Sequence, residues 1–280
     1  MIAHCERKTV QVLERNTQIC DAIERHVRPQ TFPLAIRMWP HTEPFPAKAR
    51  RPWKDLGIRM ATCQAFGISR RYGWTLALAR EDLNCPLNLV AFGFEPPPEY
   101  YLRGCCCAGM YTETEAAGAR TESMVARWEP QQYAGIVVAP LRRASFVPDV
   151  ILVFGTPGQV LRMVTAALWK RGGYLTSRFS GRLDCSDEVI HTMRTQECQV
   201  ILPCYGDRIF GHAEDHEMAF AIPASRVDEF LAGLEGTHRG GVRYPIPAFL
   251  RYTPQFPPSY ERLAEFFTAA EPAESDEASE

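Results

Sequence analysis

The chain has 280 residues, 46% of them hydrophobic and 23% charged, so it can bury a substantial core as one large domain or two small ones. Its formal charge of −2 gives no global attraction to nucleic acid or to an acidic membrane. No apolar run reaches the length of about 18 residues that a spanning helix needs, and the N-terminus lacks the apolar stretch of a secretory signal. We therefore expect a cytoplasmic protein that binds neither nucleic acid nor membrane, with homo-oligomerisation left open.

The chain predicts helices that alternate with strands. Apolar residues with a helical period favour helices, and short apolar runs between Gly, Pro and polar turns favour strands. Helices are expected over 9–28, 56–71, 85–92, 112–128, 156–171, 185–195 and 225–234. Strands are expected over 32–38, 74–79, 133–140, 148–154, 174–179, 199–203 and 216–222. The polar run at 212–217 predicts a solvated loop.

Two helix starts carry capping signals. Asn84 and Pro86 are typical of an N-cap and a first turn, and so are Thr156 and Pro157. Together these elements predict an α/β or mixed α+β fold, with a mostly buried mixed sheet flanked by helices.

The chain predicts one globular domain over 1–268, followed by a disordered acidic tail over 269–280. Segments 74–92 and 174–195 share the order strand, polar turn, Cys and helix. This order suggests an internal pseudo-duplication, with two similar halves at about 30–130 and 131–240.

Ten cysteines are unusual for a protein in a compartment that keeps thiols reduced, where metal binding, catalysis or plain burial explain them better than disulfides do. Burial in the core is expected for Cys5, Cys20 and Cys198. Four other cysteines stand at or near turns. Cys85 and Cys185 are expected in the first turn of a helix, where free N–H groups stabilise a thiolate; Cys204 follows a strand; Cys63 is expected within a helix.

Charged residues near these thiols predict a pocket. Asp207 and Arg208 follow Cys204 directly, and Arg182 precedes Cys185. A carboxylate and a guanidinium beside a thiol suit the binding of an anionic small substrate. We therefore expect Asp207, Arg208 and Arg182 to line a pocket for such a molecule.

The thiol chemistry leaves several alternatives open. Four thiolates suit zinc or an iron–sulfur cluster. Structural zinc normally uses close Cys-x₂₋₄-Cys pairs, and outside the triplet Cys105 to Cys107 the chain has none, so a [4Fe–4S] cluster is favoured and zinc is the alternative. A metal-free enzyme would use Cys204 or Cys185 as nucleophile, with the triplet as resolving thiols. An accessory protein would bind metal, haem or another ligand without turnover, and in a fourth interpretation the thiols are core residues.

An ordered series of motifs resembles one uncharacterised prokaryotic family, domain of unknown function 169, over about residues 30–235. The motifs are Glu81–Pro86 with Phe92–Phe94, Ala139–Leu141, Pro148–Val150, Gly155–Gln159, Phe179–Arg182 with Cys185, Leu202–Arg208 and Asp215–Pro223. The resemblance implies cysteines at the positions of Cys63, Cys85, Cys185 and Cys204, whereas the triplet is outside the family pattern. It implies no reaction. The hypothesis that follows is an iron–sulfur protein with redox or sulfur chemistry, a small-molecule or redox partner, and its status as an enzyme open.

Overall fold

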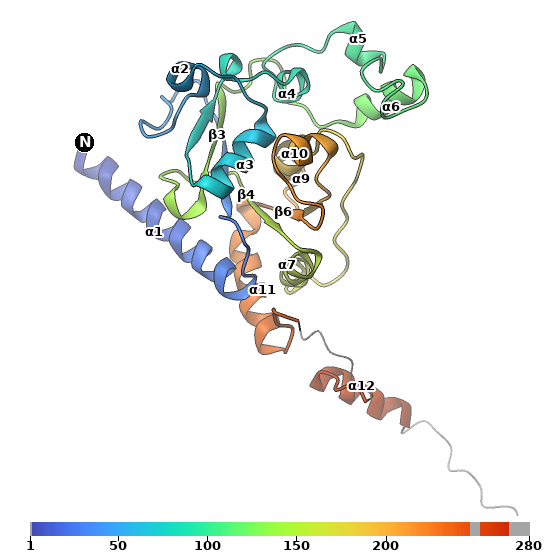
Figure 1. The fold of residues 1–280 in the computed structure, drawn as a ribbon. Helices are drawn as coiled ribbons and strands as arrows, with labels where there is room; N and C mark the ends of the chain where they lie inside the picture. The colour runs from blue at the N-terminus through green and yellow to red at the C-terminus, as the bar shows by residue number, and fades with distance from the viewer. Residues whose placement is uncertain (1, 247–252, 269–280) are drawn as a thin grey trace, which may run out of the picture.

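Six strands form one sheet in the order β2-β3-β1-β4-β6-β5, and each pairing between them is antiparallel (Figure 1). The computed structural model describes residues 2–246 and 253–268, so the acidic tail predicted at 269–280 lies outside the described residues. The strands are β1 (Leu34–Trp39), β2 (Leu76–Leu78), β3 (Gly135–Pro140), β4 (Val150–Gly155), β5 (Gln199–Ile201) and β6 (Met218–Pro223).

Helices precede, connect and follow these strands. They are α1 (Ile2–His26), α2 (Pro52–Leu56), α3 (Thr62–Tyr72), α4 (Pro86–Ala91), α5 (Glu99–Leu102), α6 (Glu115–Met124), α7 (Pro157–Leu168), α8 (Asp184–Ser186), the π-helical turn η3 (Asp187–His191), α9 (Thr192–Thr195), α10 (Tyr205–Ile209), α11 (Val227–Arg239) and α12 (Pro258–Thr268). None of the described helices is long and apolar enough to cross a bilayer.

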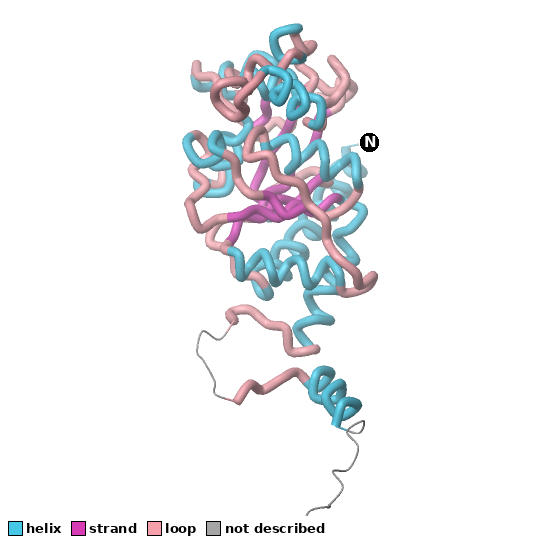
Figure 2. The backbone as a smooth tube through the Cα atoms, turned by 90° about the vertical axis from the view of Figure 1, so that its right-hand side faces the viewer, coloured by secondary structure: helices cyan, strands magenta, loops and turns pink. Residues whose placement is uncertain are grey.

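Helices cover both faces of the sheet, so the strands are buried on each side (Figure 2). Successive side chains of a strand point to opposite faces: in β1, Leu34 and Ile36 enter one core and Ala35 enters the other. Apolar residues of α1, α7 and α11 fill the second core, together with Cys20 and Cys198. Residues of α3, α4, α8 and η3 fill the first. This arrangement confirms the predicted mixed α+β fold with a buried sheet, although the sheet is antiparallel throughout and not mixed.

The strand order is symmetric about the central β1–β4 pair. Strands β1 to β3 form one half of the sheet and strands β4 to β6 form the other. In each half, the first strand in the sequence is central, the second is at the edge and the third lies between them. The predicted duplication stays a prediction, but by this order β3 belongs with β1 and β2. Two equivalent halves would therefore divide between β3 and β4, rather than near residue 130.

Several local expectations differ from the structure. Segment 174–179 is not a strand but runs beside β5, where the Val200 N–H donates to the Ser177 hydroxyl instead of to a backbone carbonyl. The N-cap of α4 is Cys85, one residue after the expected Asn84. Helices α2, α5, α10 and α12 were not predicted. The Thr156 cap and Pro157 start of α7 are confirmed.

Candidate metal–thiolate site

Four cysteines from separate parts of the chain line one cavity of about 530 Å³. Cys63 and Cys185 stand on the helices that precede the edge strands β2 and β5, and Cys85 and Cys204 precede the helices that follow those strands. Three of the four are buried, and Cys85 is half-buried. The structure therefore brings together the four thiols that the sequence singled out.

Each of the four cysteines lies at the start of a helix. Cys85 and Cys204 are the N-caps of α4 and α10, and Cys63 and Cys185 are the second residues of α3 and α8. Cys63 was expected within a helix that begins near residue 56, but α3 begins at Thr62. Free backbone N–H groups at a helix start favour a thiolate over a thiol.

Backbone N–H groups act on two of the sulfurs. The amides of Leu87 and Asn88 interact with the Cys85 sulfur and lower its pKa, though burial raises that pKa more. The amides of Asp184 and Asp207 act in the same way on Cys204. These donors would stabilise the negative charge of a thiolate ligand.

Burial is the main influence on all four thiol pKa values. It raises the pKa of Cys204 to about 12 and that of Cys185 well above the ordinary range, and the nearby Asp207 carboxylate raises both further. The pKa values of Cys63 and Cys85 are raised for the same first reason. Without a bound cation these thiols stay protonated at neutral pH, and a metal ion must displace their protons.

The thiols surround the cavity instead of meeting at a point. Within the described part of the chain, the only three metal-type ligands whose donor atoms lie within 4.8 Å of one another are Asp184, Cys204 and Asp207. Zn–S bonds of about 2.3 Å would place sulfurs about 3.8 Å apart around a tetrahedral zinc ion. A single water needs only about 10–15 Å³ of such space, so the cavity can hold a group of several atoms.

Two of the three predicted charged residues line the cavity. Asp207 is buried and accepts a hydrogen bond from the Cys204 N–H at 3.0 Å, and burial raises its pKa. Arg182 is buried at the wall, where its Nη1 lies 2.5 Å from Glu122 Oε1. Arg208 is not a lining residue: its guanidinium donates to the Glu214 carbonyl at 2.6 Å, so the expectation that it lines the pocket is wrong.

Comparison with known proteins gives the chain a family. The sequence profile of the family DUF169, described as "Uncharacterised ArCR", matches residues 22–233. The chain belongs to the DUF169 family. The uncharacterized protein MJ0308 of Methanocaldococcus jannaschii is 30% identical over 177 residues, which cover 62% of this chain and 75% of that protein. No solved structure matches this DUF169 chain.

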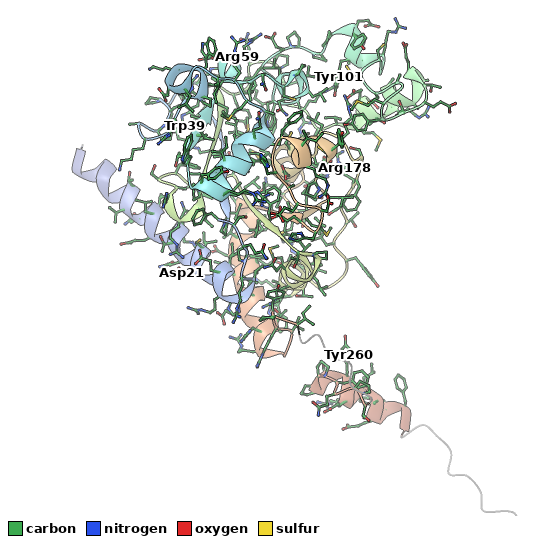
Figure 3. The ribbon with its side chains drawn as sticks, viewed as in Figure 1. Asp21, Trp39, Arg59, Tyr101, Arg178 and Tyr260 are labelled. Carbon is green, nitrogen blue, oxygen red and sulfur yellow. The ribbon has the colours of Figure 1, made fainter. Side chains whose placement is uncertain are left out.

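Buried carboxylates beside the thiols were missed by the sequence analysis of this DUF169 protein. Burial raises the pKa of Asp184 to about 8, and Glu188 is fully buried with neither oxygen hydrogen-bonded within the described residues. Asp187 between them has a charged partner, because Arg178 (Figure 3) donates to it. The spacing signal was present, since Asp184 and Glu188 flank Cys185 within one helical turn.

Asn88 was also missed. It is buried on α4, three residues after Cys85, which is the spacing of Asp207 from Cys204. The sequence contains a signal for this residue, because Cys-x-x-Asn at Cys85 and Cys-x-x-Asp at Cys204 repeat the same spacing at two helix starts.

The cysteine triplet lies apart from the cavity. Cys105 to Cys107 occupy the turns between α5 and α6, at the edge of the molecule in Figure 1, and none of the three lines the cavity. Cys107 is buried and its thiol donates to Glu122 at 3.4 Å. The same segment contributes Met110 and Tyr111 to the cavity wall.

Proposed function

We propose that this DUF169 protein is a cytoplasmic iron–sulfur protein whose Cys63, Cys85, Cys185 and Cys204 hold a [4Fe–4S] cluster. The proposed chemistry is redox or sulfur chemistry on an anionic small molecule. The observation that carries the proposal is the convergence of these four thiols on one 530 Å³ cavity. Such a cluster, when bound, supplies a one-electron redox centre whose potential depends on charge, hydrogen bonds to sulfur and burial.

The donor set and its spacing support a cluster over a single zinc ion. Four thiolates satisfy either group, but within the described residues no three of the sulfurs lie within 4.8 Å of one another, whereas a tetrahedral zinc site needs all four about 3.8 Å apart. The ligands also come from four helix starts spread over 142 residues of sequence, from Cys63 to Cys204, without the close pairs of a zinc knuckle.

A metal-free nucleophile is less well supported. A reactive cysteine needs a pKa lowered toward neutrality by positive neighbours. Here burial raises the pKa of Cys185 and of Cys204, and Asp207, the charged residue with the largest effect on both, raises these pKa values further. A positively charged metal group would lower these pKa values and favour the thiolates over the thiols.

Residues around the thiols support the binding of a small molecule in the part of the cavity that the cluster would leave free. Arg182 places a guanidinium at the wall, and the exposed side chains of Met110 and Tyr205 stand at the rim. This arginine is paired with Glu122 but is the positively charged residue of the wall, and we infer from it that the substrate is an anion.

The test is iron and acid-labile sulfide analysis, with an optical spectrum, on protein purified without oxygen. We expect iron and sulfide in matching amounts, and loss of most of both in Cys63→Ala, Cys185→Ala and Cys204→Ala. The matched control is Cys198→Ala, because Cys198 is equally buried but lies in the core on the other face of the sheet. Zinc in place of iron, or equal iron in Cys198→Ala and Cys185→Ala, would contradict the proposal.

A further inference from the structure

Asn88 connects three of the four elements that carry the thiols. Its side chain is 1% exposed, and its Nδ2 donates to the Cys185 sulfur at 3.0 Å. Its Oδ1 accepts from the backbone N–H of Thr62 at 2.9 Å, directly before Cys63. Its own backbone N–H acts on the Cys85 sulfur.

The orientation of the Asn88 amide is fixed by its neighbours. A backbone N–H can only donate, so the atom that faces Thr62 must be the oxygen. The amide NH₂ group then faces Cys185 and donates to its sulfur. Rotation of the amide by half a turn would set two donors against each other and leave the sulfur without this donor.

The Cys185 sulfur has little access to water, because the residue is buried, so a protein donor takes the place of water there. A hydrogen bond to a thiolate withdraws negative charge from the sulfur, and donors of this kind tune the metal groups that the sulfur binds.

We propose that Asn88 is a positioning residue that raises the reduction potential of the bound cluster through Cys185, a proposal that rests on the cluster assignment above. The added electron of the reduced cluster increases the negative charge on its sulfur ligands. A donor to Cys185 therefore stabilises the reduced state more than the oxidised state, which raises the potential.

At the start of α10, the residue that corresponds to Asn88 accepts a hydrogen bond instead of donating one. Asp207 follows Cys204 by three residues, as Asn88 follows Cys85, but its carboxylate accepts from the Cys204 N–H and is not a neutral donor. The two ends of the site are thus electronically unequal, and Asn88 supplies the donor at one of them.

The experiment is a redox titration, followed by the optical spectrum, of anaerobically purified wild-type, Asn88→Asp and Asn84→Asp proteins. Asn88→Asp keeps an acceptor for Thr62 and removes the donor to Cys185, but it also adds a negative charge. Asn84→Asp adds the same charge on an exposed residue of the cavity wall, whose amide donates to the Arg59 carbonyl instead. Asn88→Ala removes the donor without adding charge.

We expect a lower reduction potential in both Asn88 variants. The ratio of reduced to oxidised cluster at the wild-type midpoint should fall by up to about tenfold, because only the difference in hydrogen-bond strength between the two states counts. Asn84→Asp should shift the reduction potential by much less. A wild-type potential in Asn88→Asp or Asn88→Ala, or an equal shift in Asn84→Asp, would overturn the inference and leave the cluster assignment standing. Loss of the cluster from both folded Asn88 variants would assign Asn88 to assembly and overturn the tuning role. A wild-type protein without iron would overturn both proposals.

Discussion

At the scale of single residues, the four thiols are unequal in their access to solvent. Cys63, Cys185 and Cys204 are buried, whereas Cys85 is half-buried at the start of α4. An external molecule can therefore reach the position of the Cys85 sulfur more easily than that of the other three.

This difference predicts a selective rescue. In Cys85→Ala, we expect 2-mercaptoethanol to restore most of the iron and sulfide that the substitution removes, because the small thiol can occupy the vacated ligand position. In Cys185→Ala the same thiol should restore little, because the position is buried. The measurement is iron and sulfide content after anaerobic reconstitution with and without the thiol. Equal rescue of the two variants would show that access does not distinguish the ligands.

Sequence alone identified the four thiols but only part of their surroundings. Turn residues such as Pro86 place Cys85 at a helix start, because their backbone preferences act locally. The contact of Asn88 with Cys185 joins residues 97 positions apart, and no local pattern contains it. Arg208 was misassigned for the related reason that its orientation depends on the fold of the segment after α10.

At the scale of elements, a buried ion pair attaches α3 to the segment before β6. Arg70 donates to both oxygens of Glu217, at 2.7 and 2.8 Å, and to the carbonyl of His212. The run at 212–217 was predicted as a solvated loop, and Glu217 is instead buried against a partner 147 residues away. This pair holds the helix that carries Cys63 in place.

We predict that Glu217→Gln destabilises the protein by about 3 kcal/mol, because it leaves the buried Arg70 guanidinium without its charge partner. The matched control is Glu214→Gln, which breaks the more exposed pair with Arg71 and should cost about 1 kcal/mol or less. Urea unfolding gives both free energies. A similar cost for the two variants would mean that burial of the pair has no energetic consequence.

At the scale of the whole molecule, the two sets of three strands each contribute two of the four thiols. The helices before and after β2 supply Cys63 and Cys85, and those before and after β5 supply Cys185 and Cys204. This pairing differs from the predicted correspondence of 74–92 with 174–195, which matched Cys85 to Cys185. A group bound by all four thiols would cross-link both halves of the sheet, so its binding would stabilise the whole fold.

The buried carboxylates make stability depend on pH in the opposite sense to an ordinary ion pair. Burial, and then the nearby Asp207 and Asp187, raise the pKa of Asp184 from 3.8 to about 8. Between about pH 4 and pH 8 the folded chain keeps a proton that the unfolded chain has released. The free energy of unfolding therefore falls as the pH rises through this window, by up to about 1.4 kcal/mol per pH unit.

We predict that Asp184→Asn reduces this slope, because an amide does not titrate; the raised pKa values of Glu188 and Asp207 leave part of it. Urea unfolding at several pH values from 5 to 8, on protein kept reduced and treated with a chelator, compares the slopes. Asp215→Asn is the control, since that side chain is fully exposed and should leave the slope unchanged. A variant Asp184→Asn with the wild-type slope would mean that the Asp184 carboxyl is ionised in the folded protein.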